Sequence, residues 1–120
     1  MADKHDTAMM ENLYWWGIPT LFRAELSDVE GNDIALVGVP HSAGNGTTER
    51  DQHLGPRAVR NISAVHRRIH GTFNIDPWAM ARVTDMGDVP FPRANDNEHC
   101  IQQITDFYRQ IDKAGARPVS

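Results

Sequence analysis

Residues 33–40, Asp-Ile-Ala-Leu-Val-Gly-Val-Pro, form the longest apolar run of the chain. The run is continuous rather than alternating, which is typical of a strand buried on both faces, as in a parallel sheet. A Gly-Asn pair precedes it and Pro40 ends it, so both boundaries carry residues that interrupt regular structure. The stretch therefore predicts a central strand of a parallel sheet that is covered on both sides.

A helix is predicted to follow this strand after a long polar loop, residues 41–54. Pro56 would stand near its first position, where the missing N–H costs nothing. A helix over 56–69 would place apolar side chains on one stripe, and Gly71 would end it. The stripe consists of Val59, Ile62, Val65 (or His66) and Ile69.

A second strand, helix and strand are predicted in the C-terminal half. Residues 81–90 form a short strand that breaks at Gly87, and 116–120 begin a third strand. Between them Asn95 offers an N-cap with a glutamate three residues later, and the helix would end at Gly115. Its apolar residues, at 3.6-residue spacing, are Ile101, Ile104, Tyr108 and Ile111. This order predicts a three-layer α/β/α fold with a parallel sheet, whose ligands bind at the carboxyl ends of the strands.

The bulk composition narrows the function classes. The chain has 120 residues, a formal net charge of −4 and a single cysteine, which suits one domain in a reducing, cytoplasmic compartment. The acidity argues against nucleic-acid binding, and no apolar run reaches the length of a membrane span or a secretory signal. Four arginines in one segment are interpreted as a solvated helix face with ion pairs, or else as anion or interface contacts. They are Arg57, Arg60, Arg67 and Arg68.

Several chemical motifs are weak. Glu49 stands where a dinucleotide-binding loop needs its third glycine, so a phosphate site is not expected. Two pairs of side chains have the spacing of metal ligands: Asp51 with His53, and His66 with His70. Neither pair has the further ligands that a zinc site needs. Ser42 has no nucleophile-elbow glycines, and Cys100 is expected to be a small half-buried filler. Asp85 and Asp88, at a strand end, are expected to hold hydrogen bonds rather than metal.

Four motifs in register resemble the ureohydrolase family, the arginases, agmatinases and their relatives. Gly-Val-Pro at 38–40 and Leu-Gly-Pro-Arg-Ala-Val-Arg at 54–60 resemble the opening of that fold. The segment 17–23 resembles the arm that precedes the first strand in agmatinases. Further along the chain, residues 83–90 and 114–119 resemble segments of the same family in the same order. The loop departs from typical agmatinases and looks closer to the branch that hydrolyses guanidino acids or guanidine, such as guanidinopropionase and guanidinobutyrase.

The resemblance implies an arginase-like fold and an activity. Family members hold two divalent metal ions, usually Mn²⁺ and in some branches Ni²⁺, and release urea from a guanidino compound. They would be cytoplasmic homo-oligomers, trimers or hexamers. The family's ligand motifs, beginning with Gly-Gly-Asp-His, do not occur here, so no catalytic or metal-binding residue is assigned. The resemblance therefore implies an N-terminal arm, 1–32, and the N-terminal portion of a truncated ureohydrolase domain, 33–120, inactive by itself.

Substrate recognition is assigned to the polar loop, which in the family helps to shape the mouth of the site. The residues expected near the substrate's tail are His41, Asn45, Thr48, Glu49 and His53. The alternative is a catalytically inactive α/β module that acts in oligomer assembly or partner binding. The adjacent Trp15 and Trp16 are interpreted first as an extended arm that packs its rings into crevices. They support the alternative weakly, because exposed tryptophan is enriched at interfaces.

Overall fold

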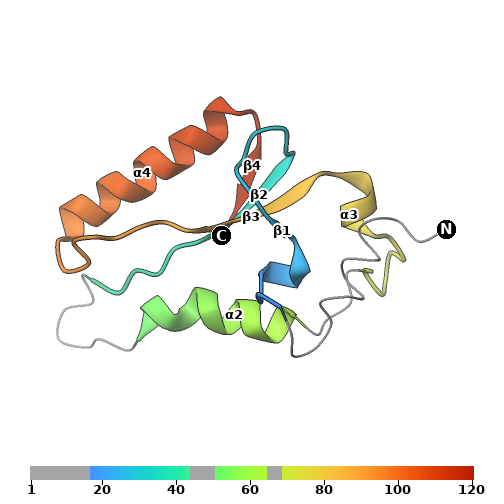
Figure 1. Ribbon diagram of the computed structural model, residues 1–120, viewed down its shortest axis with the longest axis horizontal. Coiled ribbons are helices and arrows are strands. Elements are labelled where there is room, and N and C mark those ends of the chain that lie inside the picture. Colours follow the sequence, from blue (N-terminus) through green and yellow to red (C-terminus); the bar gives the residue numbers. More distant parts are fainter. Residues whose placement is uncertain (1–16, 44–50, 65–68) are drawn as a thin grey trace.

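The computed structural model describes residues 17–43, 51–64 and 69–120, which form a small sheet with helices on both sides (Figure 1). Within these ranges two short 3-10 helices, η1 and η2, accompany three α-helices and four strands. In chain order the elements are η1 (Leu21–Arg23), β1 (Glu25–Leu26), β2 (Ile34–Gly38), η2 (Gln52–Leu54), α2 (Gly55–Ser63), α3 (Pro77–Met80), β3 (Val83–Asp88), α4 (Asn97–Lys113) and β4 (Arg117–Val119).

The sheet is parallel throughout, with the strand order β1-β3-β2-β4. Ile34 of β2 lies opposite Val83 of β3 on one side and Arg117 of β4 on the other. This confirms the predicted parallel α/β architecture, with the apolar run at 33–40 supplying an interior strand. The short β1 was not predicted; it belongs to the arm assigned to 1–32, and it joins the sheet as an edge strand beside β3.

Both faces of β2 are buried, as its continuous apolar sequence predicts. Ala35 and Val37 belong to a core cluster that includes Ile111 of α4, whereas Leu36 packs in a second cluster with Val83. Successive side chains of a strand point to opposite faces, so these clusters lie on the two sides of the sheet. In Figure 1 α4 lies on one side, and η1 and α2 lie on the other. The layers are therefore helix, sheet and helix.

Strand β3 continues through Gly87 to Asp88, where the sequence had predicted a break. Gly87 has a φ of +80°, a backbone conformation open chiefly to glycine. The pairing with β2 shifts in register between Leu36 and Gly38, so the irregularity is absorbed within the ladder. The strand therefore delivers Asp88 to the carboxyl edge of the sheet.

Helix α4 agrees with its predicted spacing except in its N-terminal part. Asp96, not Asn95, is the N-cap, and its side chain accepts a hydrogen bond from the His99 amide at 3.1 Å. Cys100 is fully buried rather than half-buried, while Ile101 is 54% exposed. Gly115, at a φ of +78°, follows the last turn as predicted. Within the described ranges no helix has the length and apolarity needed to cross a membrane.

Helix α2 differs most from its prediction. It ends at Ser63 rather than Ile69, which lies in a bend before the His70–Ile75 bridge. Val59 and Ile62 are 54% and 62% exposed, so their stripe does not face the core. The predicted positions Val65 and His66 lie outside the described residues. The helix is instead attached to its neighbours by hydrogen bonds, from Arg60 to Asp85 and from the Phe22 amide to Ser63 Oγ.

Candidate functional site

A buried ion pair attaches α2 to the end of β3. Arg60 donates from Nε to Asp85 Oδ2 and from Nη2 to Asp85 Oδ1, both at 2.9 Å, and its Nη1 also donates to Asp88. The Asp85 side chain is completely buried. Its remaining hydrogen-bonding capacity is taken by the amides of Leu21 at 2.9 Å and Gly87 at 2.8 Å. Helix α2, η1 and β3 therefore meet on one carboxylate.

The pKa values of both partners reflect this arrangement. Burial on its own would raise the pKa of Asp85, but hydrogen bonds from Arg60 and from the two backbone amides outweigh it and lower that pKa below its ordinary value. Burial would likewise lower the pKa of Arg60, and its bonds to Asp85 and Asp88 raise it instead. Both groups are thus charged at neutral pH. Asp85 and Asp88 have the hydrogen-bonding roles expected of them. Arg60 forms ion pairs, as predicted for the arginine cluster, but it does so on the side of α2 that meets β3 and not on a solvated face.

Gly38 lets the two strand ends approach closely. A Cβ atom at this position would lie 1.8 Å from Asp88 Oδ1 and 2.9 Å from the Pro56 side chain. The Gly38 carbonyl also accepts a hydrogen bond from the Val89 amide at 2.9 Å. The absence of a side chain at residue 38 is therefore what allows the Asp88 carboxylate to lie between β2 and α2.

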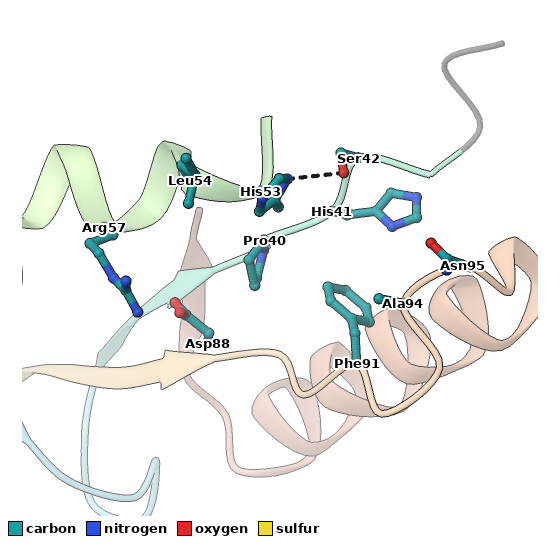
Figure 2. Close-up of a pocket in the computed structure, with 10 residues that line it drawn as sticks. All are labelled: Pro40, His41, Ser42, His53, Leu54, Arg57, Asp88, Phe91, Ala94 and Asn95. Carbon is teal, nitrogen blue, oxygen red and sulfur yellow. Dashed lines mark hydrogen bonds between the residues drawn. The ribbon is translucent and has the colours of Figure 1, made fainter. Parts of the chain in front are cut away.

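A cavity of about 490 Å³ opens at this carboxyl edge of the sheet, in the range of small-ligand pockets (Figure 2). One wall follows β2 and consists of Pro40, His41 and Ser42. A second follows β3 and consists of Asp88 and Phe91. The cavity lies where open parallel sheets bind ligands, which is the position that the strand order predicted.

The rest of the lining comes from η2 and α2, which supply His53, Leu54 and Arg57, and from the turn before α4, which places Ala94 and Asn95 beside Phe91 (Figure 2). Figure 2 shows Arg57 reaching from α2 toward the side of the cavity where Asp88 lies. The lining therefore combines apolar surface from proline, leucine, phenylalanine and alanine with groups that donate hydrogen bonds. Small-molecule sites commonly have this composition.

The structure brings two of the five predicted substrate-binding residues together. His53 Nδ1 lies 3.2 Å from Ser42 Oγ, a hydrogen bond that links η2 to the chain after β2. The His41 ring packs against Phe91 with ring centroids 5.5 Å apart. Both histidines line the cavity. The other three predicted residues, Asn45, Thr48 and Glu49, lie outside the described residues, as do Trp15 and Trp16.

Arg57 was not singled out from the sequence. It stood in a cluster interpreted mainly as a solvated helix face, and the alternative of anion contact was left open. Two features could have pointed to it: it directly follows the Gly-Pro that opens α2, and it is one turn away from His53. Its distance from the strand ends depends on the tertiary fold, which a sequence pattern does not provide.

The described residues do not fit a binuclear metal site. Across 17–43, 51–64 and 69–120 no three His, Cys, Asp or Glu side chains are grouped so that they could hold a metal ion. Asp85 has both oxygens engaged by Arg60 and backbone amides, and Asp88 is paired with Arg60. No step through a metal is assigned to these residues.

The sequence and the fold define the class of this protein. A model of the arginase family matches residues 32–120, which is most of the chain. The matched residues include strands β2, β3 and β4, helices α2 and α4, and every residue that lines the cavity. The chain belongs to the arginase family.

Individual relatives agree with this assignment. Over 105 residues the chain is 37% identical to guanidinopropionase from Pseudomonas aeruginosa, covering 87% of this chain and 32% of that protein. A hypothetical agmatinase from Burkholderia thailandensis superposes with a TM-score of 0.72 at 29% identity, covering 88% and 33% of the two chains. Proclavaminate amidino hydrolase from Streptomyces clavuligerus also gives a TM-score of 0.72, at 21% identity and 82% and 33% coverage, and shares the fold. The chain spans about a third of the length of these relatives.

Proposed function

We propose that this chain forms the substrate-tail wall of a ureohydrolase that cleaves a guanidino compound. In that reaction water adds to the guanidinium carbon, one C–N bond breaks, and the products are urea and an amine, or ammonia when the substrate is guanidine. The observation that carries the proposal is the cavity at the carboxyl ends of β2 and β3, which brings His41 and His53 together. The 37% identity to a guanidinopropionase supports the choice of a guanidino substrate.

The proposal assigns binding, not bond cleavage, to these residues. His41, held against Phe91, and His53, held by Ser42, present ring nitrogens to a ligand from fixed positions. The apolar side chains between them exclude water from a short aliphatic chain. Two divalent metal ions, with Mn²⁺ preferred over Ni²⁺, belong to the proposal through the family; they would activate the attacking water, and no described residue is assigned to hold them. We further propose that the whole enzyme is a cytoplasmic homo-oligomer, either a trimer or a hexamer.

The test uses a hybrid enzyme in which this chain replaces the matched segment of the Pseudomonas guanidinopropionase. Urea release is measured with 3-guanidinopropionate, 4-guanidinobutyrate, agmatine and guanidine. We expect His41→Ala and His53→Ala to change the order of preference among these substrates. His70→Ala is the matched control, because His70 is exposed, stacks on Phe73 with centroids 4.7 Å apart, and is not among the cavity residues. An unchanged preference in both cavity variants would refute the proposal.

A second candidate function is an inactive module that assembles with other subunits. The exposed Val59 and Ile62 of α2 favour it, because neighbouring apolar side chains on a helix are common at subunit contacts. Size-exclusion chromatography of the chain tests it. A defined oligomer that Ile62→Glu converts to monomer would support the module, and a monomer in both cases would exclude it.

A further inference from the structure

We propose that Arg57 is the residue of this cavity that binds a carboxylate, and that the preferred ligand is therefore a guanidino acid rather than agmatine. This inference rests on the proposed function, which it deepens by naming the chemical class of the substrate's tail. The charges of the groups that line the cavity support it.

The cavity holds one cationic side chain without an ion-pair partner among the described residues. Arg57 lines the cavity and forms no salt bridge with any described acid. Asp88 also lines it, but this carboxylate already accepts a charge-assisted hydrogen bond from Arg60. A planar guanidinium presents paired N–H groups that match a carboxylate, and such bonds are stronger than neutral ones.

Other polar groups of the cavity can also donate hydrogen bonds. The Asn95 amide and the His41 ring line its other end, away from Arg57 (Figure 2). Arg57 stands in the first turn of α2, at the positive end of the helix dipole. A primary ammonium such as that of agmatine would instead meet Arg57 as a like charge.

The cavity has room for a short-chain acid. Its volume of about 490 Å³ lies in the range of small-molecule pockets and exceeds the size of a three- or four-carbon acid. Pro40, Leu54 and Phe91 supply an apolar surface for methylene groups between the carboxylate and the other end of the ligand. The guanidino group, which is cationic, would extend away from Arg57.

The test separates recognition of the carboxylate from hydrolysis. Amide NMR spectra of the 120-residue chain are recorded during titration with propionate, 3-guanidinopropionate and propylguanidine at constant ionic strength. We expect the two acids to shift resonances of the cavity residues, and propylguanidine, which lacks a carboxylate, to leave them unchanged. Absence of such shifts with both acids would overturn the inference.

Substitutions at Arg57 supply the second readout. Arg57→Met should weaken the binding of both acids by about tenfold or more, because a charge-assisted pair is lost, while Arg57→Lys should retain part of it. Arg57→Gln is a second neutral replacement, so a folding defect in one variant does not remove the test. Arg109→Met is the matched control, on an exposed arginine of α4 outside the cavity. Equal binding by wild type and both neutral variants would overturn the inference.

The two proposals fail in different ways. The carboxylate inference is wrong if the neutral Arg57 variants bind propionate as wild type does, whatever the hybrid enzyme hydrolyses. The proposed function is wrong if the folded hybrid releases urea from none of the guanidino compounds, even when propionate binds at Arg57.

Discussion

Replacement of Arg60 by methionine isolates the ion pair that attaches α2 to the sheet. The variant keeps the aliphatic stem but removes the guanidinium from Asp85, whose side chain is completely buried, and from Asp88. Removal of one partner of a buried pair costs about 3–5 kcal/mol, because the other charge stays buried without compensation. Two backbone amides still donate to Asp85, and Arg60 itself is 16% exposed, so we place the loss near the lower end, at about 3 kcal/mol.

The assay is urea unfolding followed by tryptophan fluorescence, with Trp78 as a reporter that packs 5.5 Å from Phe22 between ring centroids. Arg109→Met is the matched control, since its pair with Asp106 spans 3.9 Å and both side chains are exposed. That control should lose less than about 0.5 kcal/mol. A loss below about 1 kcal/mol for Arg60→Met would refute the reasoning, because it would show that Asp85 is hydrated or neutral when Arg60 is removed.

Three further outcomes follow from the same contacts. Because the pKa of Asp85 is lowered in the folded chain, this group stabilises the fold at pH values above about 4, the ordinary pKa of a carboxyl. The free energy of unfolding should therefore fall as the pH drops below about 4, and it should fall less in Arg60→Met. Equal acid profiles of the two proteins would contradict this. Gly38→Ala should lose about 1–3 kcal/mol in urea unfolding, since its Cβ would overlap Asp88 Oδ1, and an unchanged midpoint would show that the carboxylate moves freely. Asp96→Ala should lose about 1 kcal/mol by removing the cap of α4, whereas Asp96→Asn should lose less; equal losses would indicate another role.

The sequence was most informative where structure depends on local pattern. The run at 33–40 predicts β2 because burial on both faces leaves no polar positions. The 3.6-residue spacing predicts α4, with Ile111 fully buried as expected. Gly115 also agrees with its prediction, since a positive φ after a helix favours glycine. These elements could be predicted because neighbouring residues determine them.

The errors lie where contacts are distant in sequence. Helix α2 was expected to bury an apolar stripe, yet it is held by Arg60 on a carboxylate 25 residues away. Strand β1, only two residues long, has no periodicity to detect and depends on pairing with β3. In the same way, the 3.6-residue period does not reveal that Arg57 lies beside a cavity.

The candidate site was predicted in part. His41 and His53 were expected near a substrate because they flank a long polar loop after a buried strand, and the structure places both on one cavity. The loop residues between them, Asn45, Thr48 and Glu49, remain predictions. The contribution of Phe91 and Asn95 could not be predicted, because the turn before α4 reaches the loop only in the folded chain.

The most direct test of the central claim is the ratio of kcat/KM for 3-guanidinopropionate to that for agmatine in the hybrid enzyme. The account predicts that the hybrid releases urea and prefers the guanidino acid, and that Arg57→Met lowers this ratio by about tenfold or more while Arg109→Met leaves it unchanged. A folded hybrid whose ratio is the same with and without the Arg57 guanidinium would contradict the account.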